Sequence, residues 1–265
     1  MTTIYQTLSS LGNKCALIPF ITAGNPDLVI TEKALRILDE EGADVIELGL
    51  PYSDPLADGP VIQEASKNAL DGGTTLDQIL QLLTSLNSSL KAPVILFTYY
   101  NPILARGVYK FLLDISQAGV KGIIIPDLPM EEADYILEIC VKFSLELIML
   151  ITPVSSPQRV DKILSKSQGI IYVVSSTGVT GIRNEIKNEL QHFIGNVKKK
   201  SSHQLILGFG ISTKKHVKQI SSWNIDGIVI GSAFVKRLLP SKNNDNLNEF
   251  RSFCSSISKV LTIDL

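Results

Sequence analysis

Short apolar runs recur along the chain at fairly even spacing, and β-branched residues are common in them. The runs are continuous rather than alternating, which is typical of strands buried on both faces of a parallel sheet. The sequence predicts eight such strands, at residues 16–22, 44–50, 93–100, 120–129, 145–152, 169–176, 204–210 and 226–232.

Segments with the period of an amphipathic helix lie between these runs. Residues 27–42 begin at Asp27, a suitable N-cap, and end at Gly42, a residue favoured at helix ends. The same reasoning predicts helices at residues 75–90, 103–118, 131–143, 157–166, 184–199, 213–222 and 246–262, and a short leading helix at 2–11.

Repeated strand–helix alternation over about 250 residues predicts an α/β fold, a (β/α)8 TIM barrel with a short extra N-terminal helix. A doubly wound open sheet is the main alternative. No GxGxxG sequence follows the first run, however, where such a sheet would bind a dinucleotide. The polar stretch at 240–246 is expected to be a surface loop, and no change of composition marks a linker. We therefore expect residues 1–265 to form a single TIM-barrel domain.

The composition narrows the function classes. The chain has 265 residues, of which 45% are hydrophobic, and a formal net charge of -1. No basic surplus points to nucleic acid or to an anionic membrane, and the lysine runs at 198–200 and 214–215 are expected to be solvated helix faces. No stretch approaches the ~18 apolar residues of a membrane helix, and the N-terminus has no signal core. These features predict a cytoplasmic protein, or one of the plastid stroma if it is organelle-encoded.

The cysteines and histidines do not form a recognisable site. Cys15, Cys140 and Cys254 are far apart, which argues against a disulfide framework or a zinc site and predicts buried, inactive thiols. The three histidines stand apart from any cluster of carboxylates, which argues against a histidine-based triad. We expect no metal.

Glycine-rich turns end the seventh and eighth runs, at the edge where a TIM barrel carries its active site. They are GFGIS at 208–212 and GSAFV at 231–235, and each is predicted to open a helix. Glycine lets backbone N–H groups approach a ligand closely, and helix N-termini favour anions. The two turns together predict a phosphate site, although tight turns alone would also explain the glycines.

A glutamate interrupts the second apolar run, DVIELGL. If Ile46 and Leu48 face the helices, Glu47 points into the barrel, where burial should raise its pKa and allow it to act as an acid. The alternative is a structural glutamate paired with a buried cation. The runs contain no arginine and one lysine, Lys121, at the start of the fourth run.

Two aspartates follow in a loop rich in proline and glycine. Asp58 is a second candidate catalytic carboxylate, or else the N-cap of a helix that follows from Val61. Asp54 suits loop structure or a partner contact as well as catalysis. Two carboxylates in different environments suit separate acid and base roles. An aromatic-lined cavity beside them implies a small phosphorylated substrate with a flat apolar portion, and its expected lining is Phe20, Phe97, Tyr99, Tyr172 and Phe209. No lysine lies at a strand end there, which disfavours a Schiff-base aldolase.

Several motifs together resemble the alpha subunit of tryptophan synthase. They are LIPFITAGNPD, IELGLPYSDPLADGPVIQ, YYNPI, GIIIPDLPMEE, YVVSSTGVTG, GFGIS and IVIGSAFV, and they span about residues 4 to 240. ELGLPYSDPLADGP is highly specific, whereas GFGIS or GSAFV alone would be weak. The resemblance implies a TIM-barrel lyase that cleaves indole-3-glycerol phosphate to indole and glyceraldehyde 3-phosphate.

The resemblance also implies roles for individual residues. Glu47 is the acid that protonates indole C3, and Asp58 holds the indole N–H. Thr180 lies in a loop that closes over the substrate. The remaining substrate contacts are the aromatic pocket and the phosphate donors, namely Phe20, Phe97, Tyr172, Phe209, Gly181, Gly210, Gly231 and Ser232.

The resemblance further implies a beta-subunit partner in an α2β2 assembly. Pyridoxal phosphate belongs to that subunit, so no cofactor is expected in this chain. Asp54, Pro55, Asn101 and Pro129 are expected to face the partner. The chain departs from some relatives at Tyr100 and in the residues before GVTG. Two alternatives stay open, a stand-alone lyase that releases free indole and a catalytically silent barrel. The presence of both candidate carboxylates argues against the silent barrel.

Overall fold

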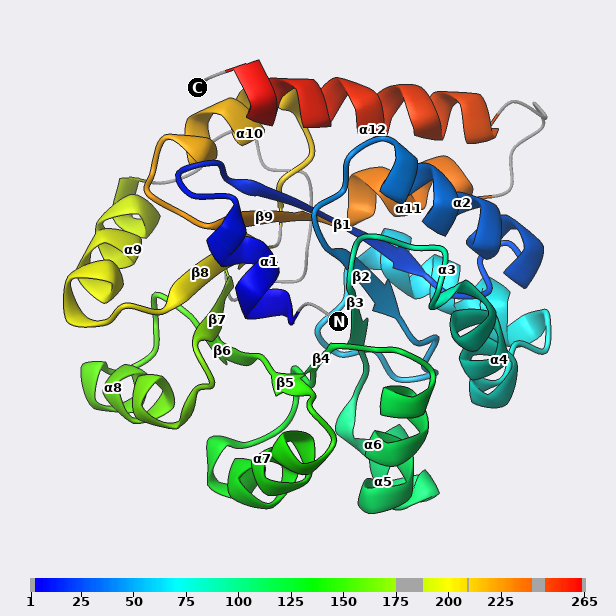
Figure 1. Ribbon diagram of the computed structural model, residues 1–265, viewed down its shortest axis with the longest axis horizontal. Coiled ribbons are helices and arrows are strands. Elements are labelled where there is room, and N and C mark those ends of the chain that lie inside the picture. Colours follow the sequence, from blue (N-terminus) through cyan, green and yellow to red (C-terminus); the bar gives the residue numbers. More distant parts are fainter. Residues whose placement is uncertain (1–2, 175–187, 209, 240–245, 264–265) are drawn as a thin grey trace.

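The strands of the computed structural model form one parallel sheet, rolled into a nearly closed barrel with helices around it (Figure 1). The structure describes residues 3–174, 188–208, 210–239 and 246–263. The strands are β1 (Ala16–Thr22), β2 (Ile46–Gly49), β3 (Val94–Phe97), β4 (Gly122–Ile124), β5 (Glu146–Leu147), β6 (Met149–Ile151), β7 (Ile170–Val174), β8 (Gln204–Gly208) and β9 (Gly227–Ile230). The predicted TIM barrel is confirmed.

The barrel of strands closes within a single predicted strand. The strand order is β5-β4-β3-β2-β1-β9-β8-β7-β6, so β5 and β6 stand at the two ends of the sheet. Both belong to the run predicted at 145–152, which pairs first with β4 and then with β7. Between them, the Ile148 N–H still donates to Ile123 O at 2.9 Å. The fifth predicted strand is therefore two short strands that join opposite edges of the sheet.

The helices follow the predicted alternation, with one correction. The segment predicted as one helix at 103–118 is two helices, α5 (Tyr100–Arg106) and α6 (Val108–Gln117), separated by Gly107 at φ +86°. This backbone conformation favours glycine and ends α5. The helices are α1 (Ile4–Ser10), α2 (Leu28–Glu40), α3 (Pro60–Asp71), α4 (Leu76–Leu86), α5 (Tyr100–Arg106), α6 (Val108–Gln117), the 3-10 helix η1 (Met130–Glu132), α7 (Ala133–Lys142), α8 (Pro157–Lys166), α9 (Asn188–Lys200), α10 (Lys214–Ser221), α11 (Ser232–Leu238) and α12 (Asn246–Ile263).

The core has two layers, which explains why the strand sequences are apolar throughout. Alternate residues of a strand point to opposite faces of the sheet. In β1, Leu17 and Ile21 belong to the outer layer between sheet and helices, whereas Ile18 and Phe20 belong to the cluster inside the barrel. Because both faces of the sheet are buried, the alternation of inward and outward residues does not show as an alternation of apolar and polar residues in the sequence.

Helix α1 closes the amino-terminal end of the barrel and lies across the ring of strands (Figure 1). Its Ile4 and Leu8 are buried in the inner cluster. The Glu146 carboxylate of β5 accepts hydrogen bonds from the backbone N–H groups of Ile4 at 2.6 Å and Tyr5 at 3.1 Å. A carboxylate is favourable at a helix N-terminus, so this contact fixes α1 to the sheet.

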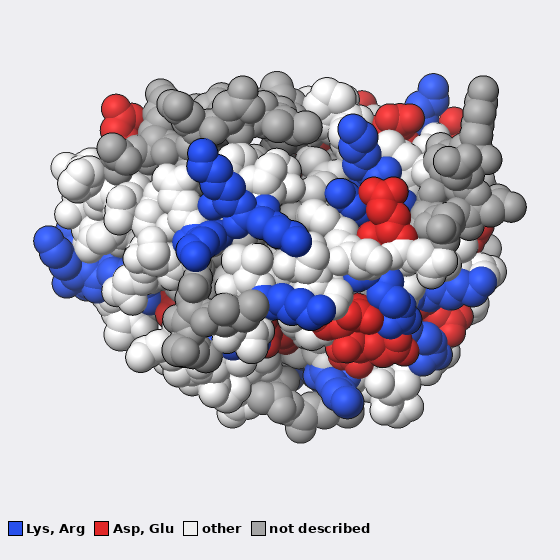
Figure 2. All heavy atoms as spheres, turned by 90° about the horizontal axis from the view of Figure 1, so that it is seen from above, with Lys and Arg blue, Asp and Glu red and all other residues white. Residues whose placement is uncertain are grey.

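Acidic and basic side chains both lie on the face that carries α12 (Figure 2). Arg251 of α12 bonds Glu40 and Glu41 at the end of α2, each at 2.7 Å. Lys198, expected on a solvated face, is instead half-buried and pairs with Asp226. In the described part of the chain, no helix is long and apolar enough to cross a membrane.

Candidate active site

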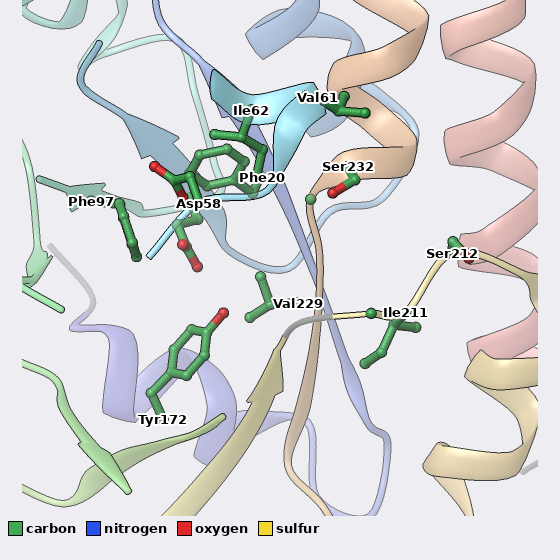
Figure 3. A pocket seen from close by; sticks show the side chains of 13 residues that line it. Phe20, Asp58, Val61, Ile62, Phe97, Tyr172, Ile211, Ser212, Val229 and Ser232 are labelled. Atoms are coloured by element: carbon green, nitrogen blue, oxygen red, sulfur yellow. The ribbon is translucent and has the colours of Figure 1, made fainter. Parts of the chain in front are cut away.

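A cavity opens at the carboxyl ends of the strands and collects most of the predicted site residues (Figure 3). Its lining consists of Phe20, Glu47, Asp58, Val61, Ile62, Phe97, Tyr172, Gly210, Ile211, Ser212, Val229, Gly231 and Ser232. These residues come from β1, β2, β3, β7 and β9 and from the segments that follow β2, β8 and β9. The predicted contacts Thr180, Gly181 and Phe209 lie outside the described residues.

Glu47 projects from the inner face of β2 and is 1% exposed. Its neighbours Ile46 and Leu48 belong to the outer core layer, as expected. Its Oε2 has no hydrogen-bond partner among the described residues, and Glu47 forms no ion pair there. Burial raises the pKa of Glu47 to about 8, and the nearby Asp58 carboxylate adds to the shift. The arrangement does not support a structural ion pair.

Asp58 ends the loop after β2 and is 5% exposed. It is not the N-cap of α3, because the N-cap is Gly59 and no side-chain hydrogen bond caps this helix. The Tyr99 hydroxyl donates to Oδ2 of Asp58 at 3.0 Å. Burial raises the pKa of Asp58 to about 6, and the hydrogen bond from Tyr99 opposes that rise. These environments favour the protonated form of Glu47 at a pH where Asp58 is already ionised.

Two glycines make room for the aromatic rings of the cavity. Phe20 and Phe97 pack edge to face, with ring centroids 5.8 Å apart. A Cβ on Gly49 would lie 2.5 Å from the Phe20 ring, so a side chain there would displace the ring. A Cβ on Gly208 would lie 1.8 Å from the Tyr172 hydroxyl. The sequence pattern assigned Gly208 to ligand approach, but the contact shows that it accommodates Tyr172.

Tyr99 has a different place from the one expected. It does not line the cavity, but lies behind Asp58 and is 2% exposed. The sequence pattern also did not predict the cavity contacts Val61, Ile62 and Val229. Val229 stands two positions before Gly231, so strand alternation could have placed it inward. No comparable signal marks Val61 and Ile62, since α3 packs over the cavity only in the folded chain (Figure 3).

The predicted phosphate end of the cavity is formed by the turns after β8 and β9. GSAFV opens a helix, because α11 begins at Ser232. GFGIS leads directly to Thr213, the N-cap of α10, which agrees with the helix predicted at 213–222. Gly210 adopts φ +80°, which favours glycine, and it lines the cavity together with Gly231 and Ser232. A role in binding phosphate stays a prediction.

The residues expected to face a partner follow β2, β3 and β4, which are neighbours in the sheet. Asp54, Asn101 and Pro129 are exposed, and Pro55 is half-buried. Parallel strands present their carboxyl ends at one edge, so these residues share a face of the barrel. Leu56, in the same loop as Asp54, is 87% exposed. Their contact with a partner stays a prediction.

The thiols are buried, as expected, and burial raises the pKa of Cys140 and Cys254 to about 12. Among the described residues, no group of three or more histidine, cysteine, aspartate or glutamate side chains could hold a metal ion.

Comparison with known proteins decides the family. The sequence model of the family described as "Tryptophan synthase alpha chain" matches residues 8–261. The chain belongs to this family. It is 52% identical to the tryptophan synthase alpha chain of Pyropia yezoensis over 98% of this chain and 99% of that protein. It is 47% identical to the corresponding protein of Acaryochloris marina over the full length of both.

Solved structures agree with this family assignment. A chain from the structure of Mycobacterium tuberculosis tryptophan synthase has a TM-score of 0.88 and 32% identity, covering 98% of this chain and 99% of that chain. A chain from the tryptophan synthase complex of Pyrococcus furiosus has a TM-score of 0.82 and 32% identity, covering 94% and 98%. The family resemblance and the fold expected from the sequence motifs are both confirmed.

Proposed function

We propose that this alpha chain cleaves indole-3-glycerol phosphate to indole and glyceraldehyde 3-phosphate, with Glu47 and Asp58 as its catalytic residues. The reaction class is that of the family, a carbon–carbon lyase of tryptophan biosynthesis. One observation supports the residue roles. Two buried carboxyl groups line one cavity, and their environments give them pKa values of about 8 and about 6. Paired groups with separated pKa values suit different roles in acid–base chemistry.

In the proposed reaction, Glu47 acts as acid and then as base. Protonated Glu47 gives its proton to indole C3, and the bond between C3 and the hydroxyl-bearing carbon of the side chain then breaks. The electron pair of that bond returns to the indole ring, while the hydroxyl proton passes to Glu47 and the carbon becomes an aldehyde. Glu47 ends protonated, so the cycle is balanced. General acid–base help of this kind is worth about 10²–10⁴ in rate.

Asp58 supports the step by charge. Protonation of indole C3 places positive charge on the ring, and a fixed carboxylate beside the indole N–H stabilises it. Phe20, Phe97 and Tyr172 provide the apolar walls for the ring. At the far end of the cavity, the backbone N–H groups of Gly210, Gly231 and Ser232 are proposed to hold the phosphate.

The partner is proposed to be a tryptophan synthase beta subunit, in an α2β2 assembly that contacts Asp54, Pro55, Asn101 and Pro129. The solved relatives from M. tuberculosis and P. furiosus are named as tryptophan synthases. Pyridoxal phosphate would then belong to the partner, with no cofactor in this chain. Cytoplasm or plastid stroma stays the predicted compartment. Neither a stand-alone lyase nor a silent barrel is favoured by a specific observation.

A lyase assay on indole-3-glycerol phosphate tests the proposal, with and without a family beta subunit. The full chain should release indole, and the beta subunit should raise the rate. Glu47→Gln should keep the fold and substrate binding but lose nearly all turnover, and Asp58→Asn should be nearly as damaging. Near-native turnover in Glu47→Gln would remove Glu47 from its role, and full activity without a partner would favour the stand-alone lyase.

A further inference from the structure

The carboxylate of Asp58 is carried by a loop, so its position depends on contacts made by that loop. Within the loop, the Asp58 N–H donates to Pro55 O at 3.0 Å. At the other end, Gln63 Nε2 donates to the Asp58 carbonyl at 2.9 Å. These bonds fix the backbone but leave the side-chain torsions of Asp58 free. Among the described residues, the hydrogen bond that reaches the carboxylate comes from Tyr99, 41 residues further along the chain.

We propose that Tyr99 is a positioning residue for Asp58, holding the carboxylate and its loop in one arrangement through two hydrogen bonds to a single hydroxyl. The hydroxyl donates to Oδ2 of Asp58 and accepts from the Ala57 N–H, each at 3.0 Å. A tyrosine hydroxyl can donate once and accept as well, so both bonds form together. The inference rests on the proposed role of Asp58 in the lyase reaction.

The backbone on both sides of Tyr99 is held by β4 and the turn after it. Before Tyr99, the Thr98 N–H donates to Ile124 O at 3.0 Å. After it, the Tyr100 N–H donates to Oδ1 of Asp127 at 2.8 Å. Asp127 belongs to the PDLP sequence and has no other assigned role in the site. The backbone that carries Tyr99 is therefore fixed on both sides of this residue.

The ring of Tyr99 is fixed as well. It stacks on Tyr52, with centroids 5.2 Å apart and an interplanar angle of 30°. It meets Phe97 edge to face at 6.2 Å. Asn101 Nδ2 donates to the Tyr52 hydroxyl at 3.3 Å, which holds the outer ring of the stack. A rigid support of this kind is what keeps a catalytic group within the small tolerance that reaction geometry allows.

Tyr99 does not line the cavity, so it should act on the rate through Asp58 rather than on substrate binding. The titratable groups that face Asp58 in the described part of the chain are Glu47 on β2, Tyr99 after β3 and Tyr172 on β7. Asp127 faces Tyr99. The Tyr99 hydrogen bond favours the ionised form of Asp58. Its loss should raise the pKa of Asp58 and move the acid limb of the rate profile to higher pH.

The test compares Tyr99→Phe with Tyr109→Phe in the full chain, assayed on indole-3-glycerol phosphate with a saturating family beta subunit. Tyr109 lies on the exposed surface of α6, and its hydroxyl accepts from Lys142 Nζ at 3.1 Å, so its variant removes a bonded hydroxyl far from the cavity. Tyr99→Phe should lower kcat by about 10- to 100-fold, the range for one hydrogen bond to a charged group. It should leave KM nearly unchanged and move the acid limb of the kcat profile to higher pH. Tyr109→Phe should leave kcat, KM and the acid limb unchanged.

A second measurement separates positioning from general structure. In an Asp58→Asn background, single-turnover rates with excess enzyme should show little further loss from Tyr99→Phe, because residues that act as a unit are not additive. A further loss as large as in the native background would overturn the inference. So would native kcat in Tyr99→Phe, or a lower kcat without movement of the acid limb. Near-native turnover in Glu47→Gln would instead overturn the proposed function, so the two failures are distinguishable.

Discussion

Replacing Glu47 with glutamine should remove activity and make the fold progressively more stable relative to the native chain as the pH rises above about 5. An acid that is protonated in the folded chain but ionised in the unfolded chain favours unfolding as pH rises. For Glu47 the ordinary pKa is 4.5 and the folded pKa is about 8. Below pH 4.5 the side chain is protonated in both states and has no effect. Above pH 4.5, the destabilisation of the folded state by Glu47 grows with pH, and it becomes constant above pH 8.

The size of the effect follows from these two values. Each tenfold difference in proton affinity between the states corresponds to about 1.4 kcal/mol. At pH 7, Glu47 should therefore lower the free energy of unfolding by about 3 kcal/mol, and between pH 5 and pH 8 the cost should grow by a similar amount. The buried amide of the glutamine has its own cost, but that cost does not depend on pH, so the pH dependence isolates the carboxyl group.

Thermal unfolding of both chains from pH 5 to pH 8 measures this difference. For a chain of this length, 1 kcal/mol shifts the unfolding midpoint by about 2–4 °C. The midpoint of Glu47→Gln relative to the native chain should thus rise by about 6–12 °C across the range. Glu64→Gln, at an exposed position of α3, is the matched control and should show no such trend. If the unfolding midpoints of Glu47→Gln and the native chain instead change with pH in parallel, the reasoning is refuted, because Glu47 would then titrate normally in the fold.

Three further predictions concern the cavity and its floor. The profile of kcat/KM against pH should be bell-shaped in the lyase assay. It should rise near pH 6 as the aspartate ionises and fall near pH 8 as the glutamate does, and a missing upper limb would contradict the assigned acid. Gly208→Ala should lower kcat/KM by about 10- to 100-fold, because Tyr172 must move to admit the new Cβ. Gly195→Ala, which meets no atom within 4 Å, is its control, and equal effects would count against the contact. Glu146→Ala should lower the free energy of unfolding by about 1 kcal/mol, measured as a lower thermal midpoint, through lost contacts at the start of α1. Its kcat should not change, since α1 closes the opposite end of the barrel.

Features that depend on neighbouring residues in the chain could be predicted from the sequence. The inward direction of Glu47 follows from Ile46 and Leu48 facing the helices, and the barrel follows from the spacing of the apolar runs. The two strands within 145–152 were not predictable, because the run is apolar on both sides of Ile148. The split depends on which strand lies beside each half.

Contacts between distant residues explain the other failures. Gly208 has the sequence context of a ligand-binding turn, and only the folded sheet brings the hydroxyl of Tyr172 to it. Tyr99 has the inward period of its strand, which predicted a cavity wall. Its hydroxyl instead meets the loop after β2, at Ala57 and Asp58, which lie 42 and 41 residues earlier in the chain. The period of a strand predicts the direction in which a side chain points. The residue that the side chain contacts depends on the tertiary structure.

Both carboxyl groups are buried, since Glu47 is 1% exposed and Asp58 is 5% exposed. Burial raises the pKa of both. The two groups differ in their hydrogen bonding. Oε2 of Glu47 has no partner among the described residues, whereas Asp58 receives the Tyr99 hydroxyl. Because Asp58 is the first of the two to ionise, its charge then raises the pKa of Glu47 further. Loss of the Tyr99 hydroxyl should therefore bring the two titrations closer together and narrow the pH range in which one group is protonated and the other ionised.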